Sequence, residues 1–388
     1  MISLLLAVIY ITFISLGLPD SLLGAAWPTM QYSVGVPIHY AGYLSMIIAG
    51  GTVISSLLTG KLLKRLGTGP LVVTSVLLTA LALLGFSFSD HFLILCLLAI
   101  PYGLGAGAID AALNHYVAVH FAARHMSWLY CFWGVGAAVS PYIMGYFITQ
   151  NENWQGGYRA VAFLQIGLTV ILFCSLPLWK KASTNSEEET QKSSLTMRDV
   201  LRKRGALQAM LTFFCYCALE STAGLWASTY LYRERLMLPE FAAKCAALFY
   251  IGITAGRFLS GFLTERLGDR LMIRIGLCGI AAGILLILIP LPPRCALAGL
   301  IIIGLGCAPI YPCQIHATPE LFGKDAAQLL IGMQMASAYI GTTLIPPLFG
   351  SFSEHAGIGS YPLFLLFFLI LMVLLTEQVH GKNKKTKA

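Results

Sequence analysis

The sequence predicts an all-α membrane protein in which twelve transmembrane helices form two pseudo-symmetric six-helix bundles. Three observations support this prediction: the composition, the placement of the basic residues and an internal repeat. The chain of 388 residues is 57% hydrophobic and only 11% charged, whereas a soluble domain carries roughly 25% charged residues. The apolar residues gather in a dozen blocks, each long enough to cross a hydrocarbon core of about 30 Å.

The apolar blocks give the predicted spans. The first block has no basic segment ahead of it and no clear cleavage site, so we interpret it as a spanning helix and not as a signal peptide. The predicted spans are residues 2–28, 39–61, 69–89, 91–121, 127–149, 157–179, 205–232, 240–263, 271–291, 295–320, 326–352 and 359–379.

The Lys and Arg residues set the predicted orientation. Twelve spans put both termini on one side, where the loops hold nineteen of the 25 Lys and Arg residues, against five on the other side. Because basic loops stay in the cytoplasm, we expect both termini there. The compact loops are typical of a multi-pass protein of a bacterial inner (cell) membrane. The net charge of +8 lies in these loops and does not indicate a nucleic-acid partner.

One long polar stretch, residues 180–204, follows the sixth span. Its Lys, Ser, Thr and Glu residues are typical of a flexible or partly helical linker. We therefore divide the chain into an N-terminal six-helix bundle (1–179), a cytoplasmic linker (180–204) and a C-terminal six-helix bundle with a short basic tail (205–388). We expect a monomer.

The two halves of the chain repeat one another. Gly51–Gly67 matches Gly252–Gly268 at an offset of 201 residues. Agreement at four places in the same order indicates duplication, and two parallel six-helix repeats with a site between them are an architecture for alternating access. The other three places are 102–110 with 303–311, Asp20 and Trp27 with Glu220 and Trp226, and Gly136 and Pro141 with Gly341 and Pro346.

Two copies of one loop motif carry a family resemblance. The segments GKLLKRLG and GFLTERLG resemble the signature loop G-x-L-x-D-R-x-G of the major facilitator superfamily, which implies that fold for essentially the whole chain. The family uses the acid of this loop to close the cytoplasmic gate, but the first copy has Lys64 at that position. The resemblance implies gating roles for Gly60, Lys64, Arg65 and Gly67 in the first copy and for Gly261, Glu265, Arg266 and Gly268 in the second.

Four ionisable residues lie deep in predicted spans: Asp20, Asp110, Glu220 and Arg257. Each costs about 2.5–3.5 kcal/mol on insertion scales, so such residues face a cavity and pair with something. Arg257 lies near the cytoplasmic half of its helix. We expect a structural or gating role for it rather than substrate binding, either by extending its charge to the membrane surface or by pairing with a gate acid such as Glu265.

Asp20 and Asp110 are the first candidates for coupling and substrate binding. Pro19 removes a backbone donor just before Asp20, so we expect the helix to bend there. Asp110 and Asn114 share one helix face because they are four residues apart. The segment DAALN is similar to the E-x-x-x-N element of fucose permease-like sugar:proton symporters, which also carry an Asp in the first helix. That resemblance implies proton coupling and sugar recognition by Asp20 and Asp110.

Glu220 is followed by hydroxyl residues and Trp226, a combination that predicts a sugar-binding wall. The weaker candidates for the same site are Trp27, Trp133, Gln334 and Tyr339.

These residues predict a secondary transporter that works by alternating access, with symport of a sugar or similar small polar solute. A cavity carboxylate that binds H⁺ or Na⁺ and then favours the solute gives such coupling. The alternative is proton-coupled efflux of drugs or other small molecules, although the fourth span lacks the R-x-x-Q-G motif of that group. We expect no enzyme, no metal and no cofactor beyond the coupling ion, because no catalytic or metal-ligand constellation is present.

Overall fold

A computed structural model describes residues 2–120, 123–151, 153–180, 197–289 and 292–384. These residues form helices and no strands. In the first half the helices are α1 Ile2–Asp20, α2 Leu22–Val34, α3 Tyr40–Leu66, α4 Thr68–Phe86, α5 Phe92–His120, α6 Ala123–Asn151 and α7 Trp154–Lys180. In the second half they are α8 Met197–Leu201, α9 Ala206–Arg233, α10 Pro239–Leu267, α11 Asp269–Leu288, α12 Pro293–Cys307, α13 Ile310–Phe322, α14 Lys324–Ala356, the 3₁₀ turn Ile358–Ser360 and α15 Tyr361–Lys384.

The predicted twelve spans are confirmed. Eleven segments of the described chain are long and apolar enough to cross a membrane, and two of them consist of two consecutive helices, α1 with α2 and α12 with α13. The twelfth span is α9, which is 28 residues long. It carries Glu220 and several hydroxyl residues, and it buries most of these against protein.

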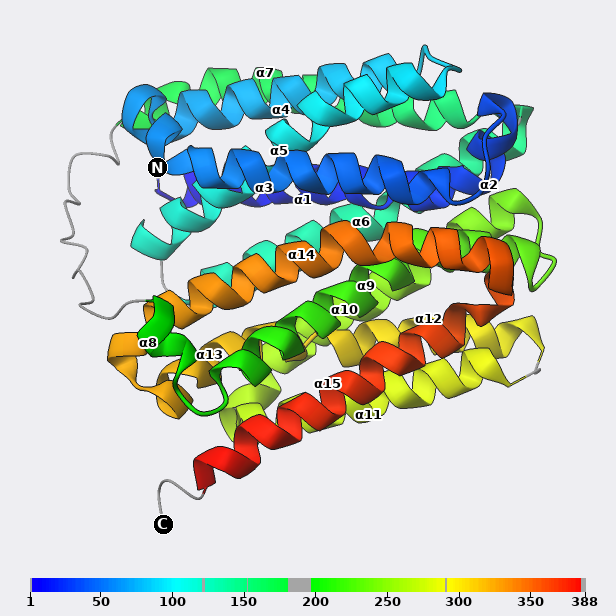
Figure 1. Cartoon of the computed structure of the whole chain (residues 1–388). Helices are drawn as coiled ribbons and strands as arrows, with labels where there is room; N and C mark the ends of the chain where they lie inside the picture. Colours follow the sequence, from blue (N-terminus) through cyan, green and yellow to red (C-terminus); the bar gives the residue numbers. More distant parts are fainter. Residues whose placement is uncertain (1, 121–122, 152, 181–196, 290–291, 385–388) are drawn as a thin grey trace.

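The helices pack in two groups with the same internal pairing (Figure 1). In the first group α1 packs on α6, α3 on α5, and α4 on both α5 and α7. In the second group α9 packs on α14, α10 on α12, and α11 on both α12 and α15. The same order of neighbours in both halves confirms the pseudo-symmetry that the repeat predicts.

Close helix contacts recur at the repeat offset. A Cβ on Gly103 would collide with the carbonyl oxygen of Ile48, and one on Gly304 would collide with that of Phe249. Both partners are shifted by the same 201 residues. Only glycine allows backbones to approach this closely, which is how helices gain contact in lipid without a hydrophobic driving force.

The predicted linker 180–204 lies largely on residues 181–196, outside the described residues. Its described part contains the short helix α8 and the turn that leads into α9. The bundle boundaries at 179 and 205 therefore stay predictions.

The two groups meet along α6 with α10, α3 with α14, and α2 with α9. Figure 1 shows both chain ends on one side of the molecule and α2 on the opposite side, which we call the distal side. Backbones touch between the groups there. A Cβ on Gly24 would lie 2.8 Å from the carbonyl oxygen of Leu225, and one on Gly42 would collide with Cα of Pro347.

Polar contacts also join the groups on the distal side. Nη2 of Arg233 donates to Oε1 of Gln31 at 3.3 Å and to the hydroxyl oxygen of Tyr32 at 3.2 Å. His39, just before α3, forms an ion pair with Glu354 near the end of α14 when its imidazole is protonated. The distal ends of the two groups are therefore held together by both backbone packing and side chains.

Candidate functional site

A cavity of about 370 Å³ lies between the two groups of helices. Helices from both halves line it, which is where a site between two repeats is expected. Asp20, Asp110, Glu220 and Arg257 all lie on its wall. The remaining polar and aromatic lining residues are Ser45, Thr52, Tyr102, Tyr130, Trp133, Ser221, Phe249, Tyr250, Tyr311, Tyr339 and Thr342.

Asp20 ends α1 at a break in the first span. Pro19 has no N–H, so the carbonyl of Ser15 loses its helical donor. Nε2 of Gln165 on α7 donates to that carbonyl at 2.6 Å, and the Ser15 hydroxyl donates in turn to the Gln165 amide oxygen. The helix resumes at Leu22. The helix is therefore interrupted at Ser21, directly after the acid, where a bend is predicted.

A second proline on α6 supports the same break. Pro141 frees the carbonyl of Ala137, four residues earlier. The hydroxyl of Ser21, in the gap between α1 and α2, donates to this carbonyl at 2.7 Å, and it is also 2.7 Å from the Ser140 hydroxyl. The interruption beside Asp20 is therefore satisfied by protein, as non-helical backbone inside a membrane has to be.

The carboxylate of Asp20 accepts a hydrogen bond from Nε1 of Trp133 on α6, at 2.7 Å. Asp110 on α5 accepts one from the Asn114 amide at 2.9 Å, so the predicted pair on one helix face forms. No Lys, Arg or His nitrogen that the structure describes lies within 4.0 Å of either carboxylate. Both acids therefore face the cavity with neutral partners.

Glu220 on α9 differs because it faces a cation. Nη2 of Arg257 lies 3.6 Å from its Oε1, and the two side chains are 13% and 20% exposed, respectively. The Arg257 guanidinium also lies over the rings of Trp133 and Tyr130, at 5.0 and 5.5 Å from their centroids. A desolvated cation–π contact contributes about 2 kcal/mol.

Arg257 does not pair with Glu265, which is one of the two alternatives that the sequence leaves open. Arg257 lies on the cavity wall, ten residues before the end of α10, and its acidic partner is Glu220. Glu265 is exposed near the end of the same helix. Sequence distance alone favoured a neighbour on α10, but the partner comes from α9, which packs beside it.

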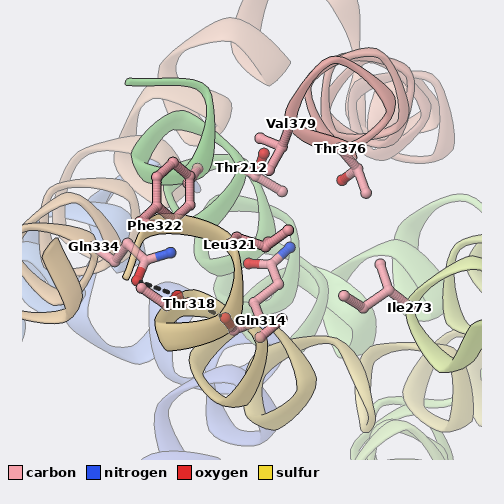
Figure 2. Close-up of a pocket in the computed structure, with 11 residues that line it drawn as sticks. Thr212, Ile273, Gln314, Thr318, Leu321, Phe322, Gln334, Thr376 and Val379 are labelled. Atoms are coloured by element: carbon pink, nitrogen blue, oxygen red, sulfur yellow. Dashed lines mark hydrogen bonds between the residues drawn. The ribbon is translucent and has the colours of Figure 1, made fainter. Parts of the chain in front are cut away.

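Asn114 does not line the cavity, although it donates to Asp110 on the cavity wall. Three further predicted binding residues do not line it either. Trp27 and Trp226 are fully buried, and their indole N–H groups donate to the backbone carbonyls of Ile38 and Pro346 at 2.7 and 3.0 Å. Gln334 lies in a second, much smaller pocket inside the C-terminal bundle, shown in Figure 2. There its amide oxygen accepts from the Thr318 hydroxyl at 3.2 Å. The geometry gives these three residues packing roles.

The weaker candidates Trp133 and Tyr339 do line the cavity, and so do several residues that the sequence reasoning missed. Tyr130 lies one helical turn before Trp133, and Met335, Tyr339 and Thr342 follow one face of α14 at steps of three or four. Such spacing around a known lining residue is a signal that could have found them. The same kind of spacing links Tyr102 to Asp110, with Ala106 halfway between them on α5. It also links Tyr250 to Arg257, seven residues later on α10, whereas Tyr311 carries no comparable pattern.

The two signature loops have the same backbone shape. Gly67 and Gly268 have φ of 78° and 75°, a region that favours glycine, and they end α3 and α10. In the described part of the chain no ion pair involves Lys64, Arg65, Glu265 or Arg266. A Cβ on Gly60 or on Gly261 would meet no atom within 4 Å. The gating role of these loops stays a prediction.

Known proteins resemble the chain over nearly its whole length. It is 22% identical to Bypass of stop codon protein 6 of Saccharomyces cerevisiae, covering 94% of this chain and 80% of that protein. It is 24% identical to the cis,cis-muconate transport protein of Acinetobacter baylyi (82% and 80% covered). It is also 24% identical to the glucose/mannose transporter GlcP of Bacillus subtilis (83% and 79% covered).

Two solved structures share the fold. A bacterial homologue of the human lysosomal transporter Spinster superposes with a TM-score of 0.78 at 12% identity, over 98% of both chains. The fucose:proton symporter FucP of E. coli superposes with a TM-score of 0.65 at 16% identity, over 96% of this chain and 98% of that one. The predicted resemblance to fucose permease-like proteins is confirmed at the level of the fold.

The family itself follows from a profile match that repeats along the chain. The profile described as Major Facilitator Superfamily matches residues 9–244 and again residues 240–388. With twelve spans in two repeats and a cavity between them, the molecule is a multi-pass membrane transporter for a small-molecule substrate and not an enzyme. The chain belongs to the Major Facilitator Superfamily.

Proposed function

We propose that this protein is a cation-coupled symporter of a sugar or a similar small polar solute, with H⁺ or Na⁺ as the coupling ion. The observation that carries the proposal is the pair Asp20 and Asp110. Both carboxylates face the cavity, and their described partners are neutral. A carboxylate without a cationic partner in a membrane is costly, so binding of H⁺ or Na⁺ stabilises it.

Coupling follows from linkage. The coupling cation neutralises the N-terminal wall, and the neutral cavity then favours the solute. Each ligand shifts the equilibrium only toward the state that it binds better. The loaded protein then rocks between its two faces, while the empty and charged protein crosses poorly.

Chemistry of the lining supports a polyhydroxylated solute. The cavity offers carboxylates, hydroxyls and a guanidinium as hydrogen-bond partners, together with aromatic faces for the C–H side of a ring. Its volume of about 370 Å³ is within the range of small-molecule sites. The relative GlcP is a glucose/mannose transporter, and the structural neighbour FucP is a fucose:proton symporter.

A second candidate is proton-coupled efflux of drugs or other small molecules. Three acids and one arginine among aromatic rings leave the cavity with excess negative charge, which also favours organic cations. Efflux predicts that the proton gradient drives a cationic solute out of the compartment. Symport predicts that the gradient drives accumulation of a neutral solute inside it.

We further propose an inner-membrane monomer with both termini in the cytoplasm. The basic residues on the side of the termini support this orientation. Because the distal ends of the bundles are in contact, this conformation corresponds to a cavity that is closed toward the outside.

Uptake into proteoliposomes tests the function. A panel of radiolabelled monosaccharides is offered under an imposed proton or Na⁺ gradient. Accumulation of one sugar that collapses with the gradient supports symport and identifies the ion. If no sugar accumulates in vesicles that hold folded protein, the symport proposal fails, and export of a cationic dye driven by the proton gradient would support efflux.

A further inference from the structure

Four side chains form a continuous series across the cavity, from one bundle to the other. Asp20 on α1 accepts from the indole N–H of Trp133 on α6 at 2.7 Å. The face of the same indole lies 5.0 Å from the guanidinium carbon of Arg257 on α10. Arg257 in turn lies 3.6 Å from Glu220 on α9. Because α6 and α10 are packed against each other, Trp133 is the point at which the series passes between bundles.

The indole of Trp133 contacts the Asp20 carboxylate through its N–H group and the Arg257 guanidinium through its ring face. A change of charge on Asp20 therefore alters the attraction between the ring and Arg257. An ionised Asp20 strengthens the hydrogen bond from the N–H group and raises the electron density of the ring. A more negative ring face attracts the guanidinium more strongly. When Asp20 binds a proton, the hydrogen bond and the attraction for Arg257 both weaken.

Arg257 has room to respond. Its 3.6 Å separation from Glu220 exceeds the ~2.7–2.9 Å of a close charge-assisted hydrogen bond. Its other polar contact, from Nη1 to the backbone oxygen of Tyr130, is 3.5 Å. The guanidinium is therefore shared between the α6 aromatic rings and Glu220, and a small change in either attraction moves it.

We propose that Trp133 is a positioning residue that transmits the charge state of Asp20, in the N-terminal bundle, to the Arg257–Glu220 pair in the C-terminal bundle. This inference rests on the proposed function, in which Asp20 binds the coupling cation. With Asp20 neutral, Arg257 moves from the α6 rings toward Glu220 and loosens the contact between α6 and α10.

Other titratable groups face Asp20 from α5 and α10, namely Tyr102, Asp110 and Tyr250. Those that face Arg257, besides Glu220, are Tyr130, Cys131, Tyr216, Cys217 and Cys307.

Tryptophan fluorescence of the full chain in lipid nanodiscs, recorded against pH, tests the inference without any solute. The difference between the emission of the native chain and that of Trp133→Phe reports the environment of Trp133. We expect this emission to change with pH, and Asp20→Asn to abolish the change. Glu220→Gln, in the opposite bundle, should shift the midpoint by at least 0.5 pH unit, about a threefold change in proton affinity. Trp226→Phe is the matched control, because that indole donates to a backbone carbonyl, and it should keep the transition.

Two results would overturn the inference. One is a Trp133 emission that does not change with pH, or that still changes in Asp20→Asn. The other is a Glu220→Gln midpoint that coincides with that of the native chain. Either can occur in a protein that still accumulates sugar, so failure of this inference is distinguishable from failure of symport.

Discussion

The two walls of the cavity carry similar groups in different electrical settings. The N-terminal wall presents Asp20 and Asp110, which accept hydrogen bonds from an indole and an amide. The C-terminal wall presents Glu220, which faces the guanidinium of Arg257. One wall thus gains or loses net charge when a cation binds, whereas the other already holds a neutralising charge of its own.

The two halves arose by duplication, but their acids differ in whether a cation lies beside them. The repeat places an acid in the first helix of each half, but only the second half adds an arginine, at the position where the first half has Ser56. That one addition gives the second acid a cationic partner, so that under the proposed function the first half binds the coupling ion. The predictions below test this division of roles between the halves.

The largest effect is expected from Asp20→Asn and Asp110→Asn. Each removes a chargeable group from the N-terminal wall, so uphill accumulation of solute should fall by on the order of tenfold or more, to equilibration, while some exchange persists. Gradient-driven uptake and counterflow in proteoliposomes measure the two activities. The matched control is Glu240→Gln, which removes a carboxylate outside the cavity. Normal accumulation in both Asp variants would disprove the division.

Arg257→Gln should reduce stability next most strongly. It leaves Glu220 in a mostly buried site without its cation, at a cost of about 3–5 kcal/mol in the free energy of unfolding. Unfolding in detergent, followed by intrinsic fluorescence, measures the loss. The double variant Glu220→Gln with Arg257→Gln removes both charges and should recover much of it. A double variant no more stable than the single one would show that charge pairing is not the cause.

Gly42→Ala should act on closure of the distal side. The added Cβ collides with Pro347 in the other bundle, and overpacking of this kind costs about 1–3 kcal/mol. The distal-closed population should therefore fall relative to the distal-open one. Spin-label distances across the distal side measure this ratio. Gly50→Ala on the same helix is the control, because its Cβ meets no atom within 4 Å. Equal behaviour of the two variants would contradict the assignment.

Glu354→Gln should have the smallest effect. It removes the ionic part of a contact with His39 in which the side chains are 33% and 14% exposed, and such a pair contributes about 0–1 kcal/mol. A double-mutant cycle with His39→Gln isolates the contribution of the pair to distal closure, measured by the same spin-label distances. An effect as large as that of Gly42→Ala would contradict this ranking.

The helices could be predicted from the sequence because a membrane admits few solutions. Each span needs about 20 apolar residues, and every predicted block corresponds to one. The ends were less accurate: the first span continues past Pro28 to Val34, and the second continues past residue 61 to Leu66. Helices extend beyond the hydrocarbon layer, where hydropathy no longer marks them.

The face of a helix was harder to predict than its existence. Trp226 follows Glu220 by six residues, which is about 240° around a helix, so it points away from the acid. Trp27 follows Asp20 by seven residues, a spacing that keeps one face in a regular helix, but the break at Ser21 destroys that phase. The pairing of Arg257 with Glu220 depends on how α9 and α10 pack, which no local pattern contains.

The bond between Gln165 and the Ser15 carbonyl has a consequence for assembly. The first helix enters the membrane with a backbone oxygen that has no hydrogen-bond donor in that helix. The side chain that donates to it is synthesised 150 residues later, in the sixth span. The Ala137 carbonyl likewise finds its partner in Ser21, a residue made long before it. The early and late spans of the first half therefore satisfy each other's backbone groups, so we expect this half to complete its packing once its sixth span, α7, has entered the bilayer.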